Sequence, residues 1–243
     1  MKIKVLYEDK DILAIDKPSG ILVYLDKKTK DKTILDWALK NYPKTELVHR
    51  LDRETSGVML LAKNQKAHAF LKKQFSAPAL EMRNRGLADR QDRTKKAYVA
   101  VVNGWVKNDH GIINKPIGRS PRDFRRHLAG RGARGELREA ITEYKVLKRF
   151  TSPRPSPYKG EGEKFTYLEI KPKTGRTHQI RVHMKYLNHP VACDSLYNPN
   201  GPCPKGMKRL ALHAKSIEFQ NLSGKTVKVE SPLPKELRKY KHN

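Results

Sequence analysis

The segment HRLDRETSG, which begins at residue 49, places the carboxylate of Asp52 between the guanidinium groups of Arg50 and Arg53. A carboxylate kept ionised by nearby arginines is a candidate nucleophile or proton acceptor. A structural role also fits, because an Asp that follows a strand often accepts hydrogen bonds from backbone N–H groups, here near Thr55. A catalytic role therefore requires partners elsewhere in the chain.

Three residues are candidate partners for Asp52. Tyr98 lies in KKAYVAV, Arg181 lies in GRTHQIRVH, and Arg50 lies two positions before the carboxylate. A guanidinium would keep Asp52 ionised and orient it, and a tyrosine ring offers a flat face to a base.

The composition indicates a polyanionic partner. The chain has 243 residues, with 52 Lys and Arg against 25 Asp and Glu, and a net charge of +27. Nucleic acid fits better than a membrane, because the longest apolar runs, such as GVMLLA, are far shorter than the roughly 20 residues of a spanning helix. The start, MKIKVLYEDK, lacks the apolar run of a signal peptide, so we expect a cytoplasmic protein.

No metal site is predicted. The two cysteines, Cys193 and Cys203, have no CxxC spacing and are expected to be free thiols. His178 and His183 are five residues apart, so a helix would place them on different faces. The histidines are therefore expected to form hydrogen bonds within the scaffold or to contact the nucleic acid: His49, His178, His183 and His213.

Short strands, turns and a few helices alternate along the chain, which predicts an α+β fold. HRLDRETSG is expected in the loop that enters a central strand. The predicted strands are 4–8, 12–17, 21–25, 57–63, 96–106, 140–150, 165–175, 210–219 and 225–232. The predicted helices are 32–43, 64–75, 176–188 and 234–243.

Three segments interrupt this periodicity. Residues 77–94 and 151–164 read as inserted loops, and the second is rich in Pro, Gly and Ser. Residues 119–139 are basic and contain glycines, so they form either a solvated loop or an arm that follows phosphates.

The segment HRLDRETSGVMLLAKN resembles the catalytic signature of the RluA-type pseudouridine synthases, a family of RNA-modifying enzymes. Further blocks agree in the same order, from about Val5 to about Pro232: EDKDILAIDKPSGI, KKAYVAVVNG, PKTGRTHQIRVHM, HPVACDSLY and RLALHAKSIEF. Three features depart from the family pattern. Residues 77–94 lengthen the path from Asp52 to Tyr98, the proline-rich segment 151–164 lengthens the path to Arg181, and DSLYNPNGP differs from the usual Asp-x-x-Tyr-Gly.

The resemblance implies one catalytic domain over residues 1–243, with a mixed, mostly antiparallel sheet, helices, an RNA-binding cleft and no N-terminal accessory module. It implies that Asp52 is the catalytic aspartate, that Tyr98 packs on the target base and that Arg181 is the basic partner of Asp52. It also implies that Arg50 can fill the space left by the flipped nucleotide. The expected RNA contacts are Arg50, Arg53, Thr55, Arg176, His178 and Gln179.

The implied function is isomerisation of uridine to pseudouridine in ribosomal or transfer RNA. This reaction changes no oxidation state and adds no atoms, so no cofactor is expected. A monomer is expected because no long exposed apolar stripe is evident in the sequence. Asp52 can serve as nucleophile or as proton acceptor, and the sequence does not choose between them. A non-catalytic RNA-binding protein with the same fold is the alternative. A DNA-binding regulator is not indicated, because no helix-turn-helix or zinc-finger signature is present.

Overall fold

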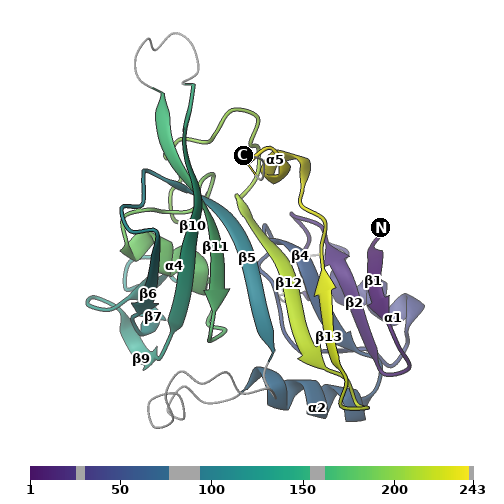
Figure 1. The fold of residues 1–243 in the computed structure, drawn as a ribbon. Helices are drawn as coiled ribbons and strands as arrows, with labels where there is room; N and C mark the ends of the chain where they lie inside the picture. The colour runs from purple at the N-terminus through teal and green to yellow at the C-terminus, as the bar shows by residue number, and fades with distance from the viewer. Residues whose placement is uncertain (26–30, 77–93, 154–161, 241–243) are drawn as a thin grey trace. The chain divides into compact units, whose positions relative to one another are not determined.

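The computed structural model describes residues 1–25, 31–76, 94–153 and 162–240. The chain divides into two compact units. Unit 1 comprises Met1–Lys96 and Ala214–Pro232, and unit 2 comprises Ala97–His213 and Leu233–Asn243. Each unit combines antiparallel strands with few helices, so the predicted α+β fold is confirmed (Figure 1).

Unit 1 is built on an antiparallel sheet. Its strands are β1 (Lys4–Glu8), β2 (Ile12–Lys17), β3 (Glu46–Leu47), β4 (Ser56–Ala62), β12 (Leu212–Gln220) and β13 (Thr226–Glu230). The order is β1-β2-β4-β12, with β13 paired to β12 and β3 to β4. All of β4 is buried, as expected for an apolar run in the middle of a covered sheet. The β2–β4 register sets Lys17 opposite Gly57, next to the HRLDRETSG loop.

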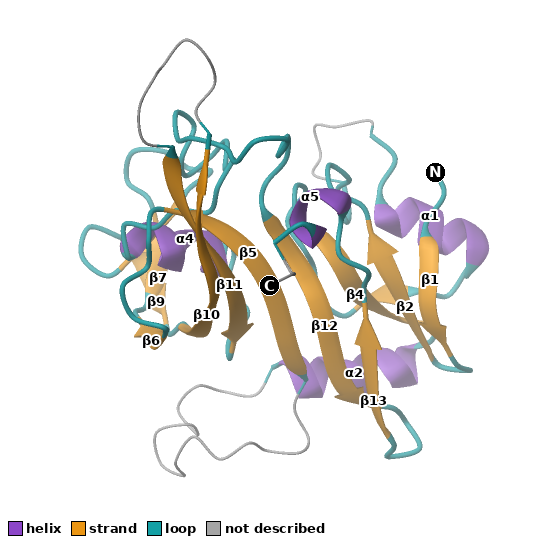
Figure 2. Ribbon diagram, turned by 45° about the horizontal axis from the view of Figure 1, so that its top comes forward, coloured by secondary structure: helices purple, strands orange, loops and turns teal. Residues whose placement is uncertain are grey.

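Two capped helices belong to unit 1, α1 (Ile34–Asn41) and α2 (Gln65–Phe75). Thr33 and Asp36 form a reciprocal capping box at α1, and the side chain of Asn64 caps α2. Both helices were predicted from the sequence, and Figure 2 shows them behind the strands of this unit.

The predicted strand at residues 21–25 is wrong. The segment has no strand structure, and the carbonyl oxygens of Leu22 and Val23 accept hydrogen bonds from the N–H groups of Ile34 and Leu35. These carbonyls therefore pair with the first turn of α1, whose N–H groups have no partner inside the helix.

Unit 2 contains a second run of antiparallel strands and a small separate sheet. Its strands are β5 (Lys95–Asn103), β6 (His110–Asn114), β7 (Ile117–Arg119), β8 (His127–Ala129), β9 (Arg134–Arg138), β10 (Ile141–Ser152) and β11 (Glu163–Pro172). The order in the larger run is β5-β11-β10-β6, and the three-stranded sheet has the order β8-β7-β9. Residues 119–139 thus form ordered strands and their connecting turns, where the sequence allowed either a loop or an arm.

The helices of unit 2 are α4 (Gln179–Tyr186) and α5 (Lys235–Arg238). α4 packs behind β10 and β11 (Figure 1), and its buried Ile180 and Met184 join the apolar core of this unit. The predicted helix began at residue 176, whereas α4 begins at Gln179. His178 has a φ of 54°, in the left-handed region, so an α-helix cannot continue through it.

The predicted inserted loops fall largely outside the described residues, which exclude 77–93 and 154–161. At the edges of the second one, β10 extends to Ser152 and β11 starts at Glu163. No helix in the described part of the chain is long and apolar enough to span a membrane.

Cys193 and Cys203 form a disulfide, with Cα atoms 5.2 Å apart. The expectation of free thiols is therefore wrong. The chain reverses direction between the two cysteines, where Gly201 N–H donates to the Asn198 carbonyl oxygen at 3.1 Å. This turn returns Cys203 to Cys193, a tertiary contact that the spacing in the sequence does not reveal.

Candidate active site

Asp52 lies in a turn just before β4, as predicted. The turn is closed by the backbone, because Thr55 N–H donates to the Asp52 carbonyl oxygen at 3.2 Å. Leu51, which precedes Asp52, is buried, while Asp52 itself is partly exposed. The turn thus has a main-chain hydrogen bond of its own.

The ammonium group of Lys17 holds this turn from inside the unit. Lys17 is completely buried, and its Nζ donates to the carbonyl oxygens of Pro18, Arg53 and Thr55 at 3.0, 3.0 and 2.8 Å. Gly20 N–H also donates to the Arg53 carbonyl at 2.8 Å. A fully buried lysine is rare unless it is paired. These three hydrogen bonds satisfy the Lys17 ammonium group and hold the backbone beside Asp52 in place.

His49 anchors the start of the motif. Its Nε2 accepts a hydrogen bond from Leu60 N–H of β4 at 2.9 Å, so a neutral imidazole carries its proton on Nδ1. Its ring stacks on Phe75 of α2, with centroids 4.6 Å apart. Burial, together with the positive charges of Lys96 and Lys72, lowers the pKa of His49 to about 3. His49 is thus a neutral scaffold residue at physiological pH.

Both arginines that flank Asp52 are exposed and contact the segment before α1. Arg50 Nη1 donates to the hydroxyl oxygen of Tyr24 at 2.5 Å. Arg53 donates from Nε to the Gly20 carbonyl at 3.0 Å and from Nη2 to Asp31 at 3.3 Å. The two side chains present positive charge on either side of the turn.

The segment that enters α4 is held by the carboxamide of Gln179. Its Oε1 accepts from the Thr174 hydroxyl at 2.7 Å and from Arg176 N–H at 2.9 Å. Its Nε2 donates to the Ile141 carbonyl at 3.0 Å and to the Thr142 hydroxyl at 2.9 Å. Gln179 is buried, so direct contact with RNA stays a prediction that would require its side chain to leave these bonds.

His183 extends this network beneath α4. Its Nε2 lies 3.0 Å from the Lys115 carbonyl oxygen and therefore carries the proton, while Nδ1 accepts from the Thr142 hydroxyl at 2.8 Å. Burial lowers the pKa of His183. The predicted scaffold role of this histidine is confirmed.

Arg181 of α4 forms a buried two-point ion pair with Asp194. Its Nε and Nη2 donate to the two carboxylate oxygens, each at 2.7 Å. Asp194 is completely buried, and its Oδ1 also accepts from the N–H groups of Leu196 and Tyr197 at 3.0 and 2.9 Å. The guanidinium of Arg181 is thus fixed in direction by a carboxylate that is itself fixed by the backbone.

Tyr197 completes the surroundings of Arg181. The Cζ atom of Arg181 lies 5.2 Å from the centroid of the Tyr197 ring, and the Tyr197 hydroxyl lies 3.0 Å from His178 Nδ1. The hydroxyl also accepts from His127 N–H of β8 at 2.9 Å. Tyr197 therefore links α4 to the small basic sheet.

Tyr98 lies in β5 and is partly buried. It pairs with Ile170 of β11, while the next residues of β5, from Val99 to Val102, are fully buried core. The position at the end of this buried run leaves the ring at the margin of the core. Its contact with a base stays a prediction, as does the meeting of Asp52 with Tyr98 and Arg181.

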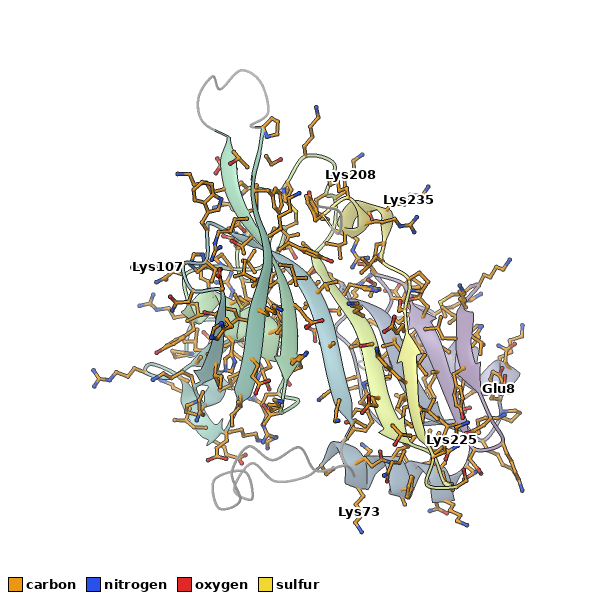
Figure 3. The ribbon with its side chains drawn as sticks, in the orientation of Figure 1. Glu8, Lys73, Lys107, Lys208, Lys225 and Lys235 are labelled. Carbon is orange, nitrogen blue, oxygen red and sulfur yellow. A yellow bond between two sulfur atoms is a disulfide. The ribbon has the colours of Figure 1, made fainter. Side chains whose placement is uncertain are left out.

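Lysine side chains extend from both units. Figure 3 shows Lys73 of α2 and Lys225 of the β12–β13 turn extending outward from unit 1. Lys107 and Lys208 extend likewise from unit 2. In the described ranges, no group of three or more His, Cys, Asp or Glu side chains is arranged to hold a metal ion.

A family model described as RNA pseudouridylate synthase matches residues 11–186. The chain belongs to this RNA pseudouridylate synthase family. Ribosomal large subunit pseudouridine synthase D of Xanthomonas campestris pv. campestris is 35% identical over an alignment of 255 residues, gaps included. The alignment covers 98% of this chain and 68% of that protein. An uncharacterised RNA pseudouridine synthase of Aquifex aeolicus is 37% identical over 204 residues, covering 80% of this chain and 56% of the relative. The chain thus spans only part of the length of each relative.

The fold of the chain also resembles that of a solved pseudouridylate synthase domain. The structure of human RNA pseudouridylate synthase domain containing 1 matches with a TM-score of 0.72 at 24% identity, covering 98% of this chain and 87% of that one. The resemblance to RluA-type enzymes is thus confirmed at the level of family, and the synthase is an isomerase that acts on RNA.

Sequence reasoning found the motif residues of the synthase but not the side chains that hold them. Lys17 and Asp194 lie inside blocks that resemble the family, IDKPSG and CDSLY, yet neither was singled out. Burial is a property of the fold, so the sequence could not distinguish these two charges from exposed ones.

Proposed function

We propose that this pseudouridine synthase uses Asp52 as the carboxylate that acts on the sugar of the target uridine. The observation that carries this assignment is how Asp52 is held. It is partly exposed on a backbone-closed turn, and buried Lys17 binds the carbonyl oxygens of the neighbouring residues. Such fixation matters because a misplacement of about 1 Å can slow a reaction about 100-fold.

The reaction breaks the C1′–N1 bond of uridine, turns the uracil and joins its C5 to C1′. The hydrogen on C5 leaves as a proton and N1 gains one, so no oxidation state changes and no redox cofactor is required. Asp52 acts either as a nucleophile at C1′ or as the acceptor of a proton from the sugar while the base is detached.

Arg181 is the proposed partner of Asp52. A guanidinium beside the carboxylate favours its ionised form, which both routes require. Asp194 holds the Nε and Nη2 groups, so Arg181 would reach Asp52 through its other N–H bonds. Tyr98 is the proposed aromatic face for the detached uracil. We propose that the two units act together as one catalytic domain, with the RNA in a cleft.

The target nucleotide must leave the helical stack before its sugar can react, which costs a few kcal/mol. Arg50, exposed and two residues from Asp52, is proposed to fill the resulting gap with its planar guanidinium. Arg53, Arg176 and His178 are proposed to contact RNA. Thr55 and Gln179 are buried and would support these contacts through the bonds that hold their turns.

The proposed substrate is ribosomal RNA of the large subunit, because the Xanthomonas relative is named for it. Transfer RNA is the second candidate. The enzyme is proposed to work as a monomer in the cytoplasm, where both RNAs occur. A non-catalytic RNA-binding role would require none of the fixation seen at Asp52.

The test is to incubate the protein with unmodified large-subunit ribosomal RNA and, separately, with transfer RNA. Pseudouridine is then mapped by carbodiimide modification and reverse-transcription stops. We expect new stops at one or a few uridines of the ribosomal RNA. Stops in transfer RNA alone would overturn the substrate but keep the reaction, and no stops in either would contradict both.

A further inference from the structure

Tyr24 is an aromatic residue that the mechanism above does not use. Its hydroxyl oxygen accepts from Arg50 Nη1 at 2.5 Å, and the Cζ atom of Arg50 lies 5.2 Å from the centroid of its ring. Tyr24 is 41% exposed, although large aromatic residues usually bury most of their surface. The guanidinium of Arg50 therefore contacts both the hydroxyl and the ring of an accessible tyrosine.

The two arginines beside Asp52 are held by chemically different partners. Arg53 binds a main-chain carbonyl and the carboxylate of Asp31, with both side chains more than half exposed at 54 and 55%. Arg50 is held by the neutral phenol of Tyr24. A phenol directs the guanidinium without cancelling its charge, so Arg50 keeps its full attraction for RNA phosphates and bases.

Ordering a free arginine side chain costs rotamer entropy, because four flexible bonds must be fixed in one geometry. A partner that already holds the side chain in its working direction removes part of that cost from the binding step. Tyr24 is placed to do this, because its ring and its hydroxyl both contact the Arg50 guanidinium.

We propose that Tyr24 is a positioning residue that keeps Arg50 directed for insertion into the RNA stack. This inference rests on the proposed function of the chain and of Arg50. The Arg50 guanidinium fills the place of the extruded nucleotide, and Tyr24 holds the guanidinium through its ring and its hydroxyl. Tyr24 should thus accelerate turnover only where a base must be extruded from a stack, and only through Arg50.

The experiment is a double-mutant cycle with Tyr24→Phe, Tyr24→Leu and Arg50→Ala. The readout is kcat/KM for tritium release from the RNA in which the target uridine has been mapped. Tyr42→Phe is the matched control, because the Tyr42 hydroxyl also bonds a charged side chain of the same unit, Glu8, at 3.0 Å. Thermal unfolding of each variant establishes that it is folded.

We expect Tyr24→Phe to lower kcat/KM about fivefold, the net value of one ordinary intramolecular hydrogen bond, and Tyr24→Leu to lower it further. In the Arg50→Ala background the same changes should have less than about a twofold effect. A second readout is 2-aminopurine beside the target, bound to Asp52→Ala protein, which should brighten less when Tyr24 is also changed.

Three outcomes would overturn the proposal. Wild-type kcat/KM for both Tyr24 variants would show that Arg50 needs no support. Equal losses with and without Arg50 would show that Tyr24 acts on RNA independently. In either case wild-type turnover would leave the proposed function intact. Absence of turnover by the wild type would remove the proposed function and this inference with it.

Discussion

Lys17 and Asp194 are both completely buried, and each fixes a loop that carries a proposed catalytic side chain or its partner. Lys17 binds the backbone close to Asp52, and Asp194 binds the guanidinium of Arg181. Burying a charge is costly unless every hydrogen bond is made, so such residues are sensitive points in the molecule.

Replacing Lys17 by Met should lower the free energy of unfolding by about 3 kcal/mol, because three carbonyl oxygens, of which that of Thr55 is buried, lose a charged donor. Urea denaturation measures the change. Lys4→Met, at an exposed position in neighbouring β1, is the control and should change stability by less than about 0.5 kcal/mol. Equal effects of the two variants would contradict the stabilising role of the Lys17 hydrogen bonds.

Replacing Asp194 by Asn should destabilise the fold by about 3–5 kcal/mol, because it leaves the buried Arg181 guanidinium without its anion. The double variant with Arg181→Gln should be less destabilised than the sum of the two single variants, by about 1–3 kcal/mol. Chemical denaturation of all four proteins gives the coupling. Strict additivity would mean that the pair contributes nothing.

The stability of the protein should fall in mild acid because of His49. Its pKa is lowered from 6.5 to about 3, so the unfolded chain takes up a proton below pH 6.5 while the native state does not. Burial of the neutral His49 ring therefore costs no stability above about pH 6.5. The free energy of unfolding then decreases by about 2 kcal/mol between pH 7 and 5. His49→Gln should lose this pH dependence, whereas His110→Gln, at an exposed position in β6, should keep it.

At the level of elements, β4 is the support for the catalytic turn. Gly57, near its start, has a φ of 115°, and a Cβ there would lie 2.2 Å from the carbonyl oxygen of Ala214 in β12. The close approach of two backbones at this point explains why the motif ends in Ser-Gly. The turn, the glycine and the strand thus form one continuous support for Asp52.

Gly57→Ala should destabilise the protein by clearly more than Gly224→Ala, as measured by thermal unfolding. Gly224 also has a positive φ, 80°, but a Cβ there would meet nothing within 4 Å. Gly224→Ala therefore introduces only backbone strain, about 1 kcal/mol. The difference in stability between Gly57→Ala and Gly224→Ala measures the clash with Ala214. Similar losses for the two variants would mean that β12 can move away from Gly57.

The strength of the local signals decided which elements the sequence predicted. Helices α1 and α2 have caps and apolar stripes, and β4 has an uninterrupted apolar run, so all three were predicted correctly. Residues 21–25 are as apolar as a strand, yet their carbonyls pair with the start of α1. The sheet formed by β7, β8 and β9 was missed because its strands are short and two of them lie within a basic, glycine-containing segment.

For the whole molecule, the ordered motifs in the sequence were sufficient to indicate the family, and the match over residues 11–186 confirmed it. The Cys193–Cys203 disulfide and the Arg181–Asp194 pair could not be predicted, because each depends on the tertiary path of the chain between its two residues. The net charge of +27 indicated a nucleic-acid partner but no particular binding residue.

The most direct test of the account is tritium release from RNA labelled at C5 of uridine, because joining C5 to the sugar must expel that hydrogen. Wild type and Asp52→Ala are compared, with Asp109→Ala as a control at an exposed aspartate. We predict release by wild type and Asp109→Ala, and none by Asp52→Ala, which should still bind RNA with nearly unchanged affinity. Release by Asp52→Ala at the wild-type rate would contradict the account.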